Sequence, residues 1–69
     1  MKIGMNTSLI EIFRKGMIGT RVMNKCRRMG INNVADIATL ANSYGSLERK
    51  FGPYCQTGKT LQTILYLAA

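Results

Sequence analysis

Apolar residues recur at helical spacing through most of this chain of 69 residues. The clearest pattern lies in residues 21–29, where one stripe is apolar and another is polar and mostly cationic. The apolar stripe consists of Val22, Met23, Cys26 and Met29, and the polar one of Arg21, Asn24, Lys25 and Arg28. Residues at positions i, i+3, i+4 and i+7 share one face of an α-helix. The spacing therefore predicts a helix with one buried face and one cationic face.

Similar spacing predicts further helices on both sides of this one. They span Leu9 to about Lys15, Val34 to about Ala41, a single turn Leu47–Lys50, and a last helix from about Gly58 or Lys59 to the C-terminus. Residues that cap helix N-termini precede three of them, namely Thr7 or Ser8, Asn33, and Ser46. Glycines that permit a helix to end follow at Gly16, Gly30 and Gly52-Pro53.

Together these elements predict an all-α fold, a compact bundle of four to five short helices with helix-hairpin-helix connections. We expect one domain over residues 7–69, a short disordered lead at residues 1–6, and less than about one residue in ten in strands. Leu9, Ile12, Phe13 and Met17 are expected on the buried side of the first helix. The predicted core consists of Phe13, Val22, Cys26, Ile31, Val34, Ile37, Leu47, Leu61, Ile64 and Leu65.

The charge balance indicates a polyanionic partner. Ten Lys and Arg residues stand against three acids, which gives a formal net charge of +7. Nucleic acid is the commonest partner of such a chain, although an anionic membrane surface or an acidic protein would also serve. No apolar run approaches membrane-spanning length and no signal-peptide pattern opens the chain, so we expect a cytoplasmic protein without a membrane partner.

Catalytic and metal-binding residues are few. The chain has no His, and its two cysteines, Cys26 and Cys55, lie far apart, so no metal-ligand pattern can be assembled. We expect both cysteines to be free thiols. Each of the three acids lies where a helix begins, which explains it better than paired acid–base chemistry. The sequence thus predicts neither an enzyme nor a cofactor or small-molecule substrate.

The segment Thr57-Gly58-Lys59-Thr60 resembles the end of a phosphate-binding loop, but Pro53 occupies the position where that loop needs a glycine. Nucleotide hydrolysis is therefore not expected. A helix that begins here would still direct free N–H groups, an ammonium and a hydroxyl at one phosphate of a nucleic-acid backbone. The alternative is that Thr60 only caps the helix and Lys59 is solvated.

Two motifs resemble a known DNA-binding domain. From Arg21 to Ile37 the chain reads R-x-x-N, then an apolar residue and G-I-N-x-V-x-D-I. This motif resembles the first helix and turn of the C-terminal domain of the bacterial RNA polymerase alpha subunit, a SAM-like helical module with helix-hairpin-helix elements. Gly58-Lys59-Thr60-Leu61 is similar to the start of its last helix. The stretch between Asp36 and Leu61 is a few residues longer than in that family. The sequence therefore leaves open whether Gly52 or Gly58 is the glycine of the second hairpin.

The resemblance implies a transcription-related module that grips the DNA minor groove and backbone phosphates with little base specificity. By residue it implies contacts from Arg21, Asn24, Lys59 and Thr60, with Gly58 allowing close approach of the backbone. Lys25 and Arg28 would add non-specific attraction. An A·T-rich minor groove is the favoured target, because its narrow form concentrates negative potential. The alternatives are docking on an acidic partner, such as RNA polymerase or a transcription regulator, and RNA binding.

Overall fold

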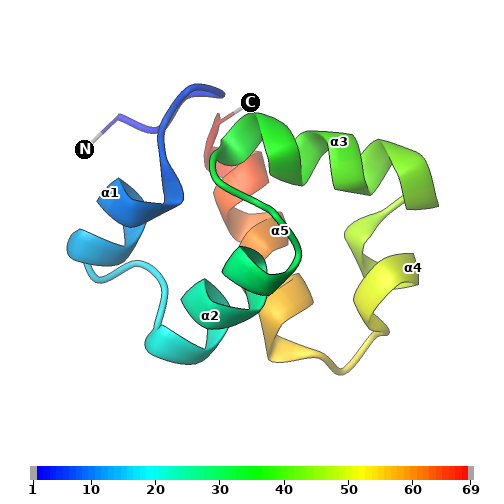
Figure 1. The fold of residues 1–69 in the computed structure, drawn as a ribbon. Coiled ribbons are helices and arrows are strands. Elements are labelled where there is room, and N and C mark those ends of the chain that lie inside the picture. Colours follow the sequence, from blue (N-terminus) through cyan, green and yellow to red (C-terminus); the bar gives the residue numbers. More distant parts are fainter. Residues whose placement is uncertain (1, 69) are drawn as a thin grey trace.

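The computed structural model describes residues 2–68; Met1 and Ala69, which belong to the expected lead and to the expected last helix, lie outside them. Within these residues the chain forms five α-helices and no strand (Figure 1). The helices are α1 (Leu9–Arg14), α2 (Thr20–Arg28), α3 (Val34–Tyr44), α4 (Leu47–Phe51) and α5 (Gln56–Ala68). The predicted all-α class is confirmed.

Three helices begin at the predicted capping residues. The Ser8, Asn33 and Ser46 side chains accept hydrogen bonds from N–H groups three residues on, at 3.2, 2.9 and 3.1 Å. At α3 the cap is reinforced, because the Asp36 carboxylate accepts the Asn32 N–H at 2.9 Å. Each bond satisfies a backbone donor that the first helical turn leaves free. These local patterns explain why the helix starts could be predicted.

Glycines with positive φ end α1 and α2 in the same way. Gly16 has φ +78° and Gly30 has φ +77°, a conformation that side chains rarely allow. After Gly30, the Ile31 N–H donates to the Cys26 carbonyl at 2.9 Å, and both side chains are buried. The positive φ of Gly30 and the burial of Ile31 with Cys26 together set the direction in which the chain leaves α2 toward α3.

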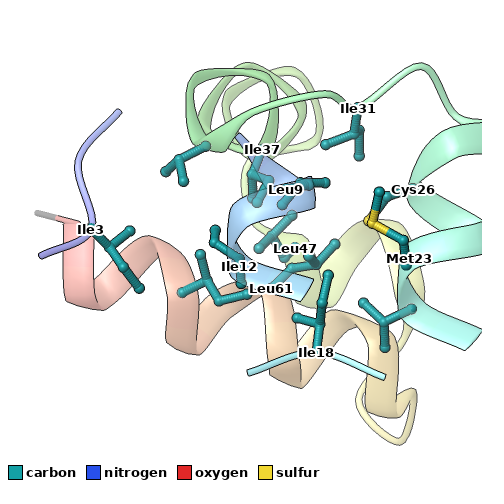
Figure 2. Packing of buried hydrophobic residues seen from close by; sticks show 13 residues of the cluster. Ile3, Leu9, Ile12, Ile18, Met23, Cys26, Ile31, Ile37, Leu47 and Leu61 are labelled. Atoms are coloured by element: carbon teal, nitrogen blue, oxygen red, sulfur yellow. The ribbon is translucent and has the colours of Figure 1, made fainter. Parts of the chain in front are cut away.

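The core gathers side chains from all five helices (Figure 2). Its buried apolar members are Ile3, Leu9, Ile12, Ile18, Val22, Met23, Cys26, Ile31, Val34, Ile37, Leu47, Leu61 and Ile64. The predicted place of Phe13 in this core is wrong, as is that of Met17, since each side chain is 38% exposed. After the turn at Gly16, Ile18 is buried instead of Met17, and within α1 only Leu9 and Ile12 are buried. Leu65 is only half-buried at the edge.

The segment before α1 is folded onto the domain, so the predicted disorder of residues 1–6 is wrong for its described part. Ile3 is buried in the core. The Met5 carbonyl accepts the Ala35 N–H at 2.9 Å, and the Thr7 carbonyl accepts the Val34 N–H at 3.1 Å. These bonds hold the segment against the start of α3.

The second half of the chain differs from prediction at its boundaries. α3 runs three residues beyond Ala41 and stops before Gly45, and α4 includes Phe51. Gly52, with φ +90°, is the turn glycine between α4 and α5. α5 begins at Gln56, so the predicted start at Gly58 or Lys59 is wrong. None of the helices described in residues 2–68 has the length and apolar character needed to cross a bilayer.

Gly58 lies inside α5 and is buried against α4. A Cβ atom on Gly58 would lie 2.9 Å from Cβ of Phe51 and 3.3 Å from its ring. The missing side chain therefore serves helix packing, since it lets α5 approach α4 at close range. This explains why a residue with low helix propensity stands within a helix.

We predict that Gly58→Ala destabilises the protein although alanine favours helix. Overpacking against Phe51 costs about 1–3 kcal/mol, whereas the helix-propensity gain is about 1 kcal/mol. Urea unfolding followed by circular dichroism should show a net loss of about 1 kcal/mol. Gly4→Ala is the control, because a Cβ there meets no atom within 4 Å. A Gly58→Ala protein more stable than the parent would contradict this packing.

Candidate nucleic-acid interface

The polar face of α2 is exposed along its whole length, as predicted. Arg21, Asn24, Lys25 and Arg28 all lie on the surface, while Val22, Met23 and Cys26 face the core. Arg27 is exposed as well, so the helix carries four cations and no acid. The division of faces means that the cationic residues have no part in the core.

The fold brings this face of α2 beside the start of α5. Together they line a hollow of about 490 Å³, formed by Arg21, Val22, Asn24, Lys25, Arg28, Gln56 and Thr57. No acidic residue is among these lining residues. Sequence reasoning missed Gln56 and Thr57, because the segment before Gly58 has no apolar periodicity that would place it in a helix. The hollow is thus a cationic, acid-free surface built from two elements distant in the chain.

The Lys25 side chain reaches from α2 toward the turn between α4 and α5. Its Nζ atom lies 6.0 Å from the centroid of the Phe51 ring, at the outer limit of a cation–π contact. Its charge also acts on Cys55, which immediately precedes α5. The long side chain therefore lies between the two halves of the hollow.

Cys55 occupies the N-terminal end of α5 and uses the backbone donors there. Hydrogen bonding from the Gly58 N–H lowers the pKa of the Cys55 thiol, and the Thr57 N–H and the charge of Lys25 act in the same direction. The Cys55 carbonyl accepts the Lys59 N–H at 3.2 Å. The first backbone donor after Gly58, the Lys59 N–H, is thus bonded within the chain.

Lys59 and Thr60 lie one turn further along α5, beside a second hollow. This hollow, of about 250 Å³, is lined by Met17, Gln56, Lys59, Thr60, Thr63 and Ile64. Gln56 borders both hollows, and its Nε2 donates to the Thr60 hydroxyl at 3.4 Å. Thr60 is the fifth residue of α5. The alternative prediction that Thr60 caps the helix is therefore wrong.

The predicted contact residues thus form two adjacent groups with one exception. Arg21, Asn24, Lys25 and Arg28 share the first hollow, and Lys59 and Thr60 share the second. Gly58 is buried and packed on Phe51, so it belongs to neither group and borders a different hollow. Lys59 also borders a hollow on its other side, which contains Glu48, so the cationic character falls off in that direction.

Comparison with protein-family models, curated proteins and solved structures gives no match for this chain. The case for its function rests on the residues and geometry described above.

We predict that Cys55 reacts with iodoacetamide well before Cys26. The thiolate is the reactive form, and the pKa of Cys55 is lowered whereas burial raises that of Cys26. The pH at which Cys55 alkylation is half-maximal should lie below that of an unperturbed thiol. Mass spectrometry of each cysteine across a pH series at low salt would measure this difference.

The same experiment tests the position of Lys25. Lys25→Ala removes a charge that favours the thiolate, so the Cys55 profile should move to higher pH. Lys15→Ala, at the end of α1, should leave it unchanged. An unchanged profile in Lys25→Ala would mean that α2 does not lie beside the start of α5 as described.

Proposed function

We propose that this chain is a DNA-binding module that grips the backbone and the minor groove with little base specificity. The observation that carries the proposal is the acid-free hollow that the cationic face of α2 forms with the start of α5. A role in transcription follows from the resemblance of its two motifs to the RNA polymerase alpha subunit domain.

The dimensions of the α2 face suit a minor groove. Arg21 and Arg28 are seven residues apart, which corresponds to about 10 Å along a helix axis. The minor groove of B-DNA is about 6 Å wide. Cations near the two ends of α2 can therefore approach phosphates on either side of the groove. Neutralising phosphates releases condensed counterions, which supplies affinity that does not depend on base sequence.

Each side chain predicted to contact DNA has a proposed role. Arg21 enters the groove, where a narrow A·T segment concentrates negative potential and favours a guanidinium. Asn24 hydrogen-bonds a phosphate or a groove edge, while Lys25 and Arg28 add non-specific attraction. Lys59 holds a phosphate through its ammonium, with the Thr60 hydroxyl beside it. The Lys59 N–H has no role in this proposal, because the Cys55 carbonyl already accepts it.

One observation favours a second candidate, docking on an acidic partner protein such as RNA polymerase or a transcription regulator. Ile10, Phe13 and Met17 are 52%, 38% and 38% exposed on and after α1. Arg14 and Lys15 are exposed next to them. Apolar side chains among cations suit a partner segment that alternates apolar and acidic residues. This surface belongs to α1 and not to the hollow between α2 and α5.

We predict that Arg21→Ala weakens binding to an A·T-rich duplex by about 1–3 kcal/mol. Lys59→Ala should cost less and should reduce the slope of log K against log salt by about one unit. Fluorescence anisotropy with a labelled duplex at several salt concentrations would measure both effects. Both residues are exposed, so neither variant should unfold.

Arg14→Ala is the matched control, because it removes an exposed cation on α1 that lines neither of the two hollows. Its effect on DNA binding should be small. Equal losses in all three variants would show attraction by bulk charge alone, without a defined site. If the parent protein does not bind DNA even at low salt, docking on a protein partner becomes the better explanation.

A further inference from the structure

The α2–α3 and α4–α5 connections share one construction. Gly30 and Gly52, both with positive φ, each stand four residues before the first residue of the next helix. The residue directly before that helix occupies its N-terminal end, Asn33 in one case and Cys55 in the other. From the glycine to the next helix the two connections can therefore be compared position by position, although the α2–α3 connection has five residues and the α4–α5 connection four.

The tip of the first hairpin is covered by the N-terminal segment. The Leu9 N–H donates to the Asn32 carbonyl at 2.9 Å, and the Asn32 N–H donates to Asp36. Ser8 and Asn33 form a β-bridge. The backbone N–H and carbonyl of Asn32 are thus both used within the protein, while its side chain is exposed.

The tip of the second hairpin is open. Tyr54 is the counterpart of Asn32, two residues after the turn glycine, and its side chain is 91% exposed. Pro53 beside it is exposed as well. Figure 1 shows this connection at the lower edge of the molecule, between α4 and α5. An aromatic ring left in water forgoes the free energy that its burial would give, so its exposure calls for an explanation.

The turn that carries Tyr54 is well defined on both sides. The Gly52 N–H donates to the Glu48 carbonyl at 2.7 Å, and Pro53 has a fixed φ. On the other side, the Cys55 carbonyl accepts the Lys59 N–H at 3.2 Å. The ring is therefore presented from an ordered backbone, which lowers the entropy lost when it contacts a partner.

Tyr54 also stands two residues before Gln56, the first residue of α5 and a lining residue of the cationic hollow. Phe51 and Cys55, which flank the turn, both lie near Lys25 of α2. Gln56 and Thr57, the two residues after Cys55, line the hollow itself. A DNA strand held by α2 and the start of α5 would pass close to the ring.

We infer that Tyr54 stacks on an unpaired base, so that the module prefers DNA with a gap or a frayed end over continuous duplex. This inference rests on the proposed function. Bases in a duplex are already stacked, and a side chain that enters between them must open a step at a cost. An unpaired base next to a duplex offers its face without that cost, and aromatic stacking accepts any base.

Stacking of one base on an aromatic ring is expected to strengthen binding about 5- to 150-fold. Electrostatics alone would not produce this preference, because a gap removes phosphates and single strands give a weaker salt dependence than duplex. A preference for gapped DNA would therefore report on a contact with bases.

The test compares a labelled continuous duplex with the same duplex containing a short central gap, by fluorescence anisotropy. The parent protein should bind the gapped DNA more tightly, by at least about fivefold. Tyr54→Ala should lose that preference yet bind the continuous duplex within about twofold of the parent. Tyr54→Trp should retain the preference. Tyr66→Ala is the control, since Tyr66 is 79% exposed but lies near the other end of α5.

Each other outcome overturns the inference. If the parent binds both DNAs equally and still depends on Arg21, Tyr54 does not stack on bases, although the proposed DNA binding stands. A preference that persists in Tyr54→Ala would place the base contact elsewhere. If neither DNA binds, the inference and the proposed function fail together.

Discussion

The close packing of α5 on α4 at Gly58 is the contact on which the proposed interface depends. Phe51 fills the space that a side chain on Gly58 would need, so the two helices approach each other closely after a turn of only a few residues. This approach fixes where α5 begins and brings Gln56 and Thr57 beside α2. Gly58, which the sequence suggested for contact with DNA, thus contributes to the surface indirectly, by allowing α5 to pack closely on α4.

The two faces of α2 serve different purposes. Its buried side chains, Val22, Met23 and Cys26, join a core to which every helix contributes. A domain of this size buries a limited apolar area, so each of these contacts is a substantial part of its stability. The exposed face contributes nothing to that core, which leaves its cations free to be placed for binding. The same separation means that binding and folding can be tested independently.

Local signals explain what could be predicted from the sequence. The caps at Ser8, Asn33 and Ser46 and the turn at Gly30 depend on neighbours within a few residues, and the structure has them as expected. The exposed face of α2 followed from spacing alone. Its four predicted residues do lie together along one hollow.

The errors arose where a residue's role depends on distant parts of the chain. Gly58 has the low helix propensity of a boundary residue, and only its contact with Phe51 reveals it as an interior one. Ile3 lies in the core without belonging to any periodic pattern, and Phe13 is on the surface although its spacing from Leu9 is helical. The openness of the Tyr54 turn follows from where the N-terminal segment packs, which no local pattern encodes.

The most direct test of the account is whether α2 and the α4–α5 hairpin act as one DNA-binding surface. Backbone amide shifts recorded by NMR during titration with an A·T-rich duplex would answer this. The account predicts coherent shifts in residues 21–28 and 54–60, with α1 and α3 little affected. Shifts confined to α1 around Ile10 and Phe13, or spread evenly over all basic residues, would contradict it.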